Sequence, residues 1–151
     1  MTIADLLRPE GVVLDLRAPE KRRLLDDLAR RASALAGLEP AAIAEALNRR
    51  EQLGSTGMGS GIAIPHARLP ALAQPVGVFV RLRPALDFDA IDGQRVDLVF
   101  LLLLPAEIQG DALNALACVA RRLRDEQVAS ALRKAPKPET AFSILTGPQA
   151  P

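Results

Sequence analysis

The segment from Val96 to Leu104 constrains the fold more than any other, because it is apolar at almost every position. Its uninterrupted apolar part is far shorter than the ~20 residues that a membrane-spanning helix needs. The segment is instead typical of a central strand that helices cover on both faces. We therefore expect a layered α/β sandwich without membrane insertion, built as a single domain, because 151 residues suit one hydrophobic core.

Two amphipathic helices are predicted in the first third of the chain. The first begins at Pro19 and Glu20, buries one apolar stripe, and stops near Gly37, a residue that commonly ends helices. The second runs from Pro40 to Gln52 and leads the chain into a cluster of glycines.

The remaining pattern alternates between strands and helices. Segments 12–16 and 76–82 read as strands, and the alternation within 76–82 predicts one face more buried than the other. Further helices are expected after Asp111, around residues 128–132 and around residues 142–145. Residues 148–151 are expected to form a disordered tail, which leaves residues 1–147 for the domain.

Composition narrows the classes of function. Nineteen basic and eighteen acidic residues leave a net charge of +1, which gives no global field for attracting nucleic acid or an anionic membrane. Paired arginines at positions 22–23, 30–31 and 121–122 fall on predicted polar helix faces and are expected to be solvated. The N-terminus has acids and a proline where a secretory signal would have basic residues, so we expect a cytoplasmic protein.

Cysteine and histidine each occur once, as Cys118 and His66. A single cysteine forms no internal disulfide, and its apolar neighbours predict a small buried side chain. One cysteine and one histidine do not make a zinc site, so we expect neither a metal nor a cofactor.

The glycine cluster is the first candidate for chemistry. Glycines permit positive φ angles, so successive N–H groups and hydroxyls in such a loop can surround an anion. A flexible connector between a helix and a strand remains an alternative, and no nucleotide-binding P-loop motif follows. The candidate phosphoryl-binding residues here are Ser55, Thr56, Gly57, Gly59 and Gly61.

His66 is the second candidate and follows directly after Pro65. A solitary histidine is often structural or merely exposed. Imidazole also titrates near neutrality and keeps a nitrogen lone pair, so it can accept and later release a phosphoryl group. Arg50 and Arg68 would supply positive charge beside it, although Arg50 also fits a solvated position at a helix end.

The sequence around these residues resembles a known family. Arg50 and Glu51, followed by GSTGMGSGIAIPHARL, resemble the phosphorylation-site motif of fructose/mannitol-type IIA domains of the bacterial phosphoenolpyruvate-dependent sugar phosphotransferase system. The later segments LDFDAIDGQRVDLVFLLLLP and LNALACVARRLRD most resemble the nitrogen-related, regulatory branch. The similarity covers nearly the whole chain.

This resemblance implies a mixed β-sheet flanked by helices, with residues 1–147 as the IIA domain of type 2. It implies that an HPr-like carrier phosphorylates His66 on Nε2, with Arg50 assisting the phosphoryl group. One departure stands out, because Ala112 occupies the place of a second histidine that family members commonly have. We expect that position, in the first turn of a helix, to have room for a larger side chain.

Three functions follow from the resemblance. The first is a regulatory phosphoacceptor whose charge change switches the bound partner, at a surface expected around Met58, Ile62 and Leu69. The second is a transport component that passes the phosphoryl group from His66 to a IIB domain. The third is a binding module without phosphotransfer, which Ala112 favours.

Overall fold

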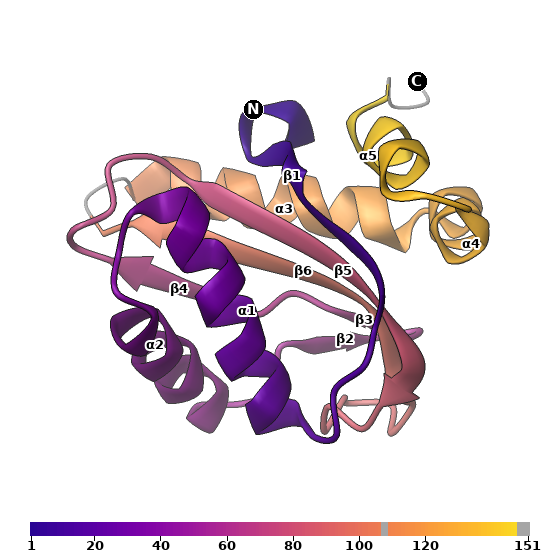
Figure 1. Cartoon of the computed structure of the whole chain (residues 1–151), viewed down its shortest axis with the longest axis horizontal. Helices are drawn as coiled ribbons and strands as arrows, with labels where there is room; N and C mark the ends of the chain where they lie inside the picture. Colours follow the sequence, from indigo (N-terminus) through magenta and orange to yellow (C-terminus); the bar gives the residue numbers. More distant parts are fainter. Residues whose placement is uncertain (107–108, 148–151) are drawn as a thin grey trace.

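The computed structural model describes residues 1–106 and 109–147, which build a six-stranded mixed sheet with helices on both faces (Figure 1). The sheet order is β1-β5-β6-β3-β2, and β4 also pairs with β6. The elements are η1 (Ile3–Asp5), β1 (Leu7–Leu16), α1 (Lys21–Ala36), α2 (Pro40–Gln52), β2 (Gly57–Gly59), β3 (Ile62–Ala63), β4 (His66–Leu69), β5 (Val76–Leu86), β6 (Val96–Pro105), α3 (Gln109–Arg124), α4 (Glu126–Lys134) and α5 (Pro138–Thr146). The predicted α/β sandwich with a mixed sheet is confirmed.

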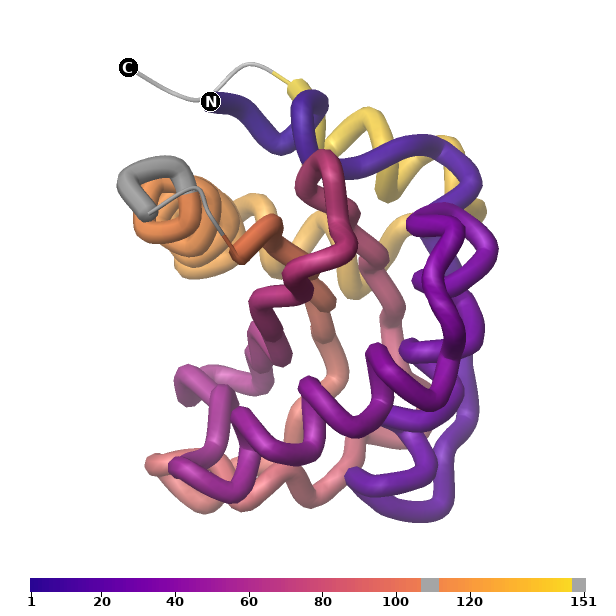
Figure 2. Tube along the Cα trace, turned by 90° about the vertical axis from the view of Figure 1, so that its left-hand side faces the viewer, coloured from indigo at the N-terminus to yellow at the C-terminus, as the bar shows by residue number. Residues whose placement is uncertain are grey.

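Strand β6 separates two hydrophobic cores. Its residues Phe100 and Leu102 belong to the core that includes α3, α4 and α5, whereas Val99 and Leu101 belong to the core that includes α1 and α2. Figure 2 shows these two layers of helices on opposite sides of the sheet. The apolar run therefore forms the strand buried on both faces that its composition predicts.

The first two helices lie where the sequence pattern places them. Helix α1 starts at Lys21 and ends at Ala36. The C-cap residue Gly37 has a φ of 70°, the left-handed conformation that glycine adopts without strain. Helix α2 spans Pro40–Gln52, and proline occupies its first turn, where no N–H group is needed.

Strand β5 differs from the predicted half-buried strand. It lies between β1 and β6, and both of its faces are covered, because Phe79 belongs to one core and Val78 and Val80 belong to the other. Residues 77–82 are all buried. Arg81 is 6% exposed and is paired: it donates to Asp15 and to the carbonyls of Leu132 and Ala135 at the end of α4. A buried arginine thus connects the sheet to that helix end.

One of the paired arginines is not solvated, contrary to the prediction from its helix face. Arg122 is 8% exposed and donates to the carbonyl of Ile144 in α5. Cys118 on the same helix is buried at 5% exposure, as its apolar neighbours predict. The expected tail at 148–151 lies outside the described residues.

The helices within the described ranges are too short or too polar to cross a lipid bilayer.

Candidate functional site

Two short strands place His66 at the edge of the sheet. Ile62 pairs with Leu98 and His66 pairs with Leu102, both parallel to β6, so β3 and β4 follow one line beside that strand. Ile64 and Pro65 interrupt the line, because proline has no N–H group to pair. The Pro65 carbonyl still accepts from Leu102 N at 2.9 Å, which fixes the backbone directly before His66.

Both ring nitrogens of His66 have a partner. Nδ1 lies 2.9 Å from the carbonyl oxygen of Ile64, an acceptor, so Nδ1 carries the proton and donates it. Nε2 is then left with a lone pair, which accepts from Arg50 Nε at 3.3 Å. Another guanidinium nitrogen of Arg50, Nη1, donates to the carbonyl oxygen of Gly54 at 2.9 Å. The arrangement presents a neutral imidazole with Nε2 as its basic atom.

The surroundings keep His66 uncharged. Burial lowers the pKa of His66 below its ordinary value, because a charged imidazolium loses solvation there. The hydrogen bond to Ile64 opposes this effect, whereas the positive charge of Arg50 adds to it. At neutral pH the ring is therefore in the form that can act as a nucleophile.

His66 and Arg50 open into a shallow depression of about 230 Å³. One side is polar and comes from the end of α2 and the glycine loop, and the other is apolar and comes from α3. The lining residues are Arg50, Ser55, Thr56, Gly57, Met58, Ile64, His66, Leu116 and Ala120. The fold thus brings five of the sequence-predicted site residues together: His66, Arg50, Ser55, Thr56 and Gly57.

The polar groups of the loop are already engaged within the protein. The Ser55 hydroxyl donates to the carbonyl of Phe88 at 2.7 Å and accepts from Gly57 N at 3.0 Å. The Thr56 hydroxyl and its backbone N–H both donate to Glu51. These groups shape the wall of the depression, and Arg50 is the charged donor that faces Nε2.

Three further predicted residues lie outside this lining. Gly59 and Gly61 have φ angles of 93° and 81°, as the turn between β2 and β3 requires. A Cβ on Gly61 would lie 2.6 Å from Nη2 of Arg133, which pairs with Asp97 at 2.8 Å. Arg68 is exposed on β4, and its charge reaches His66 only as a small lowering of the pKa.

Glu51 binds the glycine loop through Thr56, although the sequence pattern does not predict it as a site residue. It follows Arg50 in the motif, but a glutamate near a helix end usually reads as a solvated charge. Its side chain is 6% exposed and pairs with Lys21 at 2.7 Å. The partner comes from the start of α1, so only the fold reveals the pair.

The partner-binding surface that the sequence predicts around Met58, Ile62 and Leu69 is only partly exposed in the structure. Met58 lines the depression, but Ile62 and Leu69 are 2% and 7% exposed and belong to the two cores, because their side chains point between sheet and helices. Large apolar side chains that are exposed include instead Leu53, Ile91 and Leu113, at 83%, 90% and 69% exposure.

Ala112 does not have the space that its position in the first turn of a helix suggested. It is 2% exposed and belongs to the core on the α3 side of the sheet. The α3 residues that line the depression, Leu116 and Ala120, lie further along the helix.

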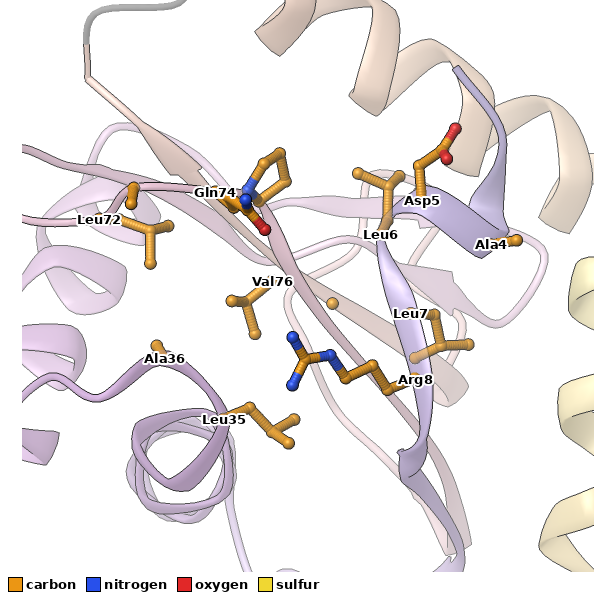
Figure 3. A pocket seen from close by; sticks show the side chains of 13 residues that line it. Ala4, Asp5, Leu6, Leu7, Arg8, Leu35, Ala36, Leu72, Gln74 and Val76 are labelled. Carbon is orange, nitrogen blue, oxygen red and sulfur yellow. The ribbon is translucent and has the colours of Figure 1, made fainter.

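A second depression of about 250 Å³ lies between the start of β1 and the end of α1 (Figure 3). Arg8 extends across it toward Leu35 and Val76, while Asp5 points away and accepts from Thr2 N at 2.8 Å. This depression is lined mainly by apolar residues and by Arg8, and no histidine lines it.

Among the residues that the structure describes, no three histidine, cysteine or acidic side chains gather in a way that would hold a metal ion.

Comparison with known proteins identifies the family of the chain. Residues 5–147 match the sequence model of the family described as "Phosphoenolpyruvate-dependent sugar phosphotransferase system, EIIA 2". A "Nitrogen regulatory protein" of Bradyrhizobium diazoefficiens is 44% identical over 150 residues, which cover 99% of this chain and 98% of that protein.

Solved structures share the fold. The crystal structure of nitrogen regulatory protein IIA-Ntr from Neisseria meningitidis superposes with a TM-score of 0.91 at 35% identity, covering 95% of this chain and 99% of that one. Enzyme IIAMTL of Escherichia coli, solved in complex with phosphorylated enzyme IIBMTL, shares the fold at a TM-score of 0.78 and 20% identity, covering 95% and 100%. The chain therefore belongs to the EIIA type 2 family of the phosphoenolpyruvate-dependent sugar phosphotransferase system.

Proposed function

We propose that this protein is a cytoplasmic phosphoacceptor that receives a phosphoryl group on His66 from a phosphorylated HPr-like carrier and acts mainly as a nitrogen-related regulator. The observation that carries the proposal is the pair of hydrogen bonds on the imidazole. The carbonyl oxygen of Ile64 lies 2.9 Å from Nδ1 of His66 and accepts a hydrogen bond from it. The proton is therefore on Nδ1, and the lone pair is on Nε2 of the histidine that lines the depression. The similarity to nitrogen regulatory proteins supports the regulatory part.

Transfer needs no proton to be removed first. Nε2 of His66 forms its bond to phosphorus while the bond between phosphorus and the donor nitrogen of the carrier breaks. The proton stays on Nδ1, where the carbonyl of Ile64 stabilises the positive charge that the ring gains. The protein's contribution is therefore position and electrostatics, as phosphoryl transfer generally requires.

Arg50 has two successive roles in this mechanism. Before transfer its Nε–H occupies the lone pair of Nε2, so this hydrogen bond must break when the N–P bond forms. The guanidinium remains tied to the carbonyl of Gly54 at 2.9 Å and is then beside the phosphoryl oxygens. A guanidinium binds such oxygens through charge-assisted hydrogen bonds.

The carrier would dock on the exposed apolar side chains around the depression. Leu53 precedes Gly54, Ile91 follows Ala90, which packs on Gly57, and Leu113 lies one turn before Leu116. Contiguous exposed apolar patches commonly mark surfaces that bind other proteins, and these side chains would contribute to one. After transfer, a charge of about −2 beside this surface would change which partner binds.

Intact mass tests the proposal. Incubation with phosphoenolpyruvate, enzyme I and an HPr-like carrier is expected to add the mass of one phosphoryl group, lost again in acid, and His66→Ala is expected to gain nothing. Leu113→Asp is expected to slow transfer from the carrier but not from phosphoramidate, a small donor that needs no docking surface. Retention of an acid-labile phosphoryl group by His66→Ala would refute the assignment.

A transport role is the second candidate, in which His66 passes the phosphoryl group to a IIB domain. It is favoured by the fold shared with enzyme IIAMTL, which was solved with phosphorylated enzyme IIBMTL. Transfer from phosphorylated protein to a purified fructose- or mannitol-type IIB domain would identify this role. Partner proteins captured from cytoplasm in only one phosphorylation state would identify the regulatory one. A binding module without phosphotransfer would show neither the mass gain nor this difference.

A further inference from the structure

Glu51 is a buried carboxylate directly behind the site, with a side chain that is 6% exposed. Burial of a carboxylate is costly unless it is paired and hydrogen-bonded. Glu51 meets both conditions. Its Oε2 lies 2.7 Å from Nζ of Lys21 and accepts from Thr56 N at 3.2 Å, and its Oε1 accepts from the Thr56 hydroxyl.

A continuous chain of hydrogen bonds leads from Glu51 to the imidazole. Thr56, held by Glu51, accepts through its carbonyl from Ile64 N at 3.1 Å. Ile64 in turn accepts from Nδ1 of His66 at 2.9 Å. The neighbouring residue in α2, Arg50, faces the other ring nitrogen. One helix end therefore acts on both nitrogens: directly on Nε2 and, through the loop, on Nδ1.

Lys21 occupies an unusual position for a cation. It is the first residue of α1, where the helix dipole disfavours positive charge. Its Nζ lies 2.7 Å from Glu51 and 4.5 Å from the centroid of the Phe88 ring. The carbonyl of Phe88 accepts from Ser55 at 2.7 Å, so the lysine lies between two anchors of the loop. The pairing with Glu51 offsets the local cost and neutralises the buried carboxylate.

We propose that Glu51, in its charge pair with Lys21, is a positioning residue for His66. It fixes Thr56, and through Thr56 the carbonyl of Ile64, so that the proton stays on Nδ1 and the lone pair stays on Nε2. Glu51 does not touch the phosphoryl group. The functional consequence rests on the proposed phosphoacceptor role, whereas the control of the tautomer does not.

The tautomer can be measured directly, because His66 is the only histidine. The ¹⁵N chemical shifts of its two ring nitrogens report which one carries the proton. We expect the Nδ1–H form in the wild type at neutral pH and a mixture of both neutral forms in Glu51→Gln, which keeps the shape but loses the charge. Phosphorylation of His66 in that variant is expected to slow about tenfold or more, the effect of one lost charge-assisted hydrogen bond.

Matched variants separate positioning from general damage. Lys21→Met is expected to give a mixture of tautomers and slower phosphorylation, as Glu51→Gln does. Lys21→Arg keeps the positive charge and is expected to keep the wild-type tautomer and phosphorylation rate. Glu45→Gln is the control, because Glu45 forms an exposed pair with Arg49 at 2.6 Å on the same helix. Thr56→Val removes the hydroxyl bond alone and provides the test if Glu51→Gln does not fold.

The outcomes distinguish the two proposals. The positioning role is wrong if Glu51→Gln keeps the wild-type tautomer and is phosphorylated as fast as the control Glu45→Gln. Thr56→Val is judged in the same way if Glu51→Gln does not fold. If the tautomer shifts in the variants but the wild type accepts no phosphoryl group from either donor, the positioning role stands and the phosphoacceptor function fails. A lower rate without a tautomer shift would also overturn the positioning role.

Discussion

Arg50 donates from Nε to Nε2 of His66 across 3.3 Å, so its guanidinium lies in front of the nitrogen that carries the lone pair. The pair joins the end of α2 to the start of β4, two elements that the glycine loop separates in sequence. Because the contact is with the nitrogen that we propose as the phosphoryl acceptor, a bond formed at Nε2 must displace this hydrogen bond.

Replacing Arg50 tests this relationship. Arg50→Ala is expected to slow phosphorylation by about 100-fold or more, the usual effect of removing a donor that faces developing charge. Arg50→Lys is expected to be intermediate, because an ammonium cannot hold His66 and Gly54 with the geometry of a guanidinium. The assay is the initial rate of transfer from phosphorylated carrier, read by intact mass.

Arg49→Ala is the matched control. It removes the same charge from the adjacent residue, whose side chain is 73% exposed and pairs only with Glu45 among the contacts described. Its rate is expected to equal that of the wild type. Equal rates in Arg49→Ala and Arg50→Ala would mean that Arg50 contributes only general charge.

The titration of His66 provides a second prediction. Since burial lowers its pKa in the folded protein, the unfolded chain binds more protons at pH values between the two pKa values. The contribution to stability is therefore present above about pH 6.5, the ordinary value. It is lost as the pH falls through the lower, folded pKa.

NMR of the single imidazole measures this shift. The midpoint is expected to lie below that of the unfolded chain, and Arg50→Ala is expected to raise it because a positive neighbour is removed. A folded midpoint at or above the unfolded value would contradict the structure. It would mean that the imidazole is solvated or paired with a carboxylate.

Glycine substitutions separate the loop's conformation from its chemistry. Gly61→Ala is expected to lower the free energy of unfolding more than Gly37→Ala, although both residues have positive φ angles. A Cβ at Gly37 meets nothing within 4 Å, so its cost is the backbone strain of about 1–2 kcal/mol. At Gly61 the Cβ would also collide with Arg133 and Asp97. Urea denaturation of the two variants gives the comparison, and equal losses would show that the ion pair moves aside freely.

The helices and long strands were predictable from sequence because the spacing of their apolar residues shows which faces are buried. Segment 96–104 is apolar on both faces and becomes β6, and the helical stripe before Gly37 becomes the buried face of α1. The strands β2, β3 and β4 are two to four residues long, too short to show a period. Their pairing with β6 exists only once distant segments meet.

The site was predictable in its residue types and less so in its contacts. His66 and Arg50 stand out in the motif, and the fold brings them together. The roles of the loop hydroxyls depend on partners far along the chain, such as Phe88 for Ser55. Nothing in the sequence indicates that Lys21 pairs with Glu51, because a lysine on a helix is ordinarily expected to be solvated.

The last prediction concerns Ala112, which stands where members of the resembled family commonly have a second histidine. Because Ala112 is 2% exposed within the core, Ala112→His would insert a larger, polar ring among packed side chains. Overpacking of this kind costs about 1–3 kcal/mol, and an unpartnered imidazole adds to the cost.

We therefore expect Ala112→His to lower the free energy of unfolding in urea by about that amount. Leu113→His is the matched control, since Leu113 is 69% exposed and its replacement is expected to change stability by less than about 0.5 kcal/mol. If Ala112→His is as stable as the wild type, the ring has found space, and Leu116, one turn further along α3, lines the depression. The lifetime of phosphorylated His66 would then change in Ala112→His but not in Leu113→His, because only a ring that reaches the depression can donate to the phosphoryl group.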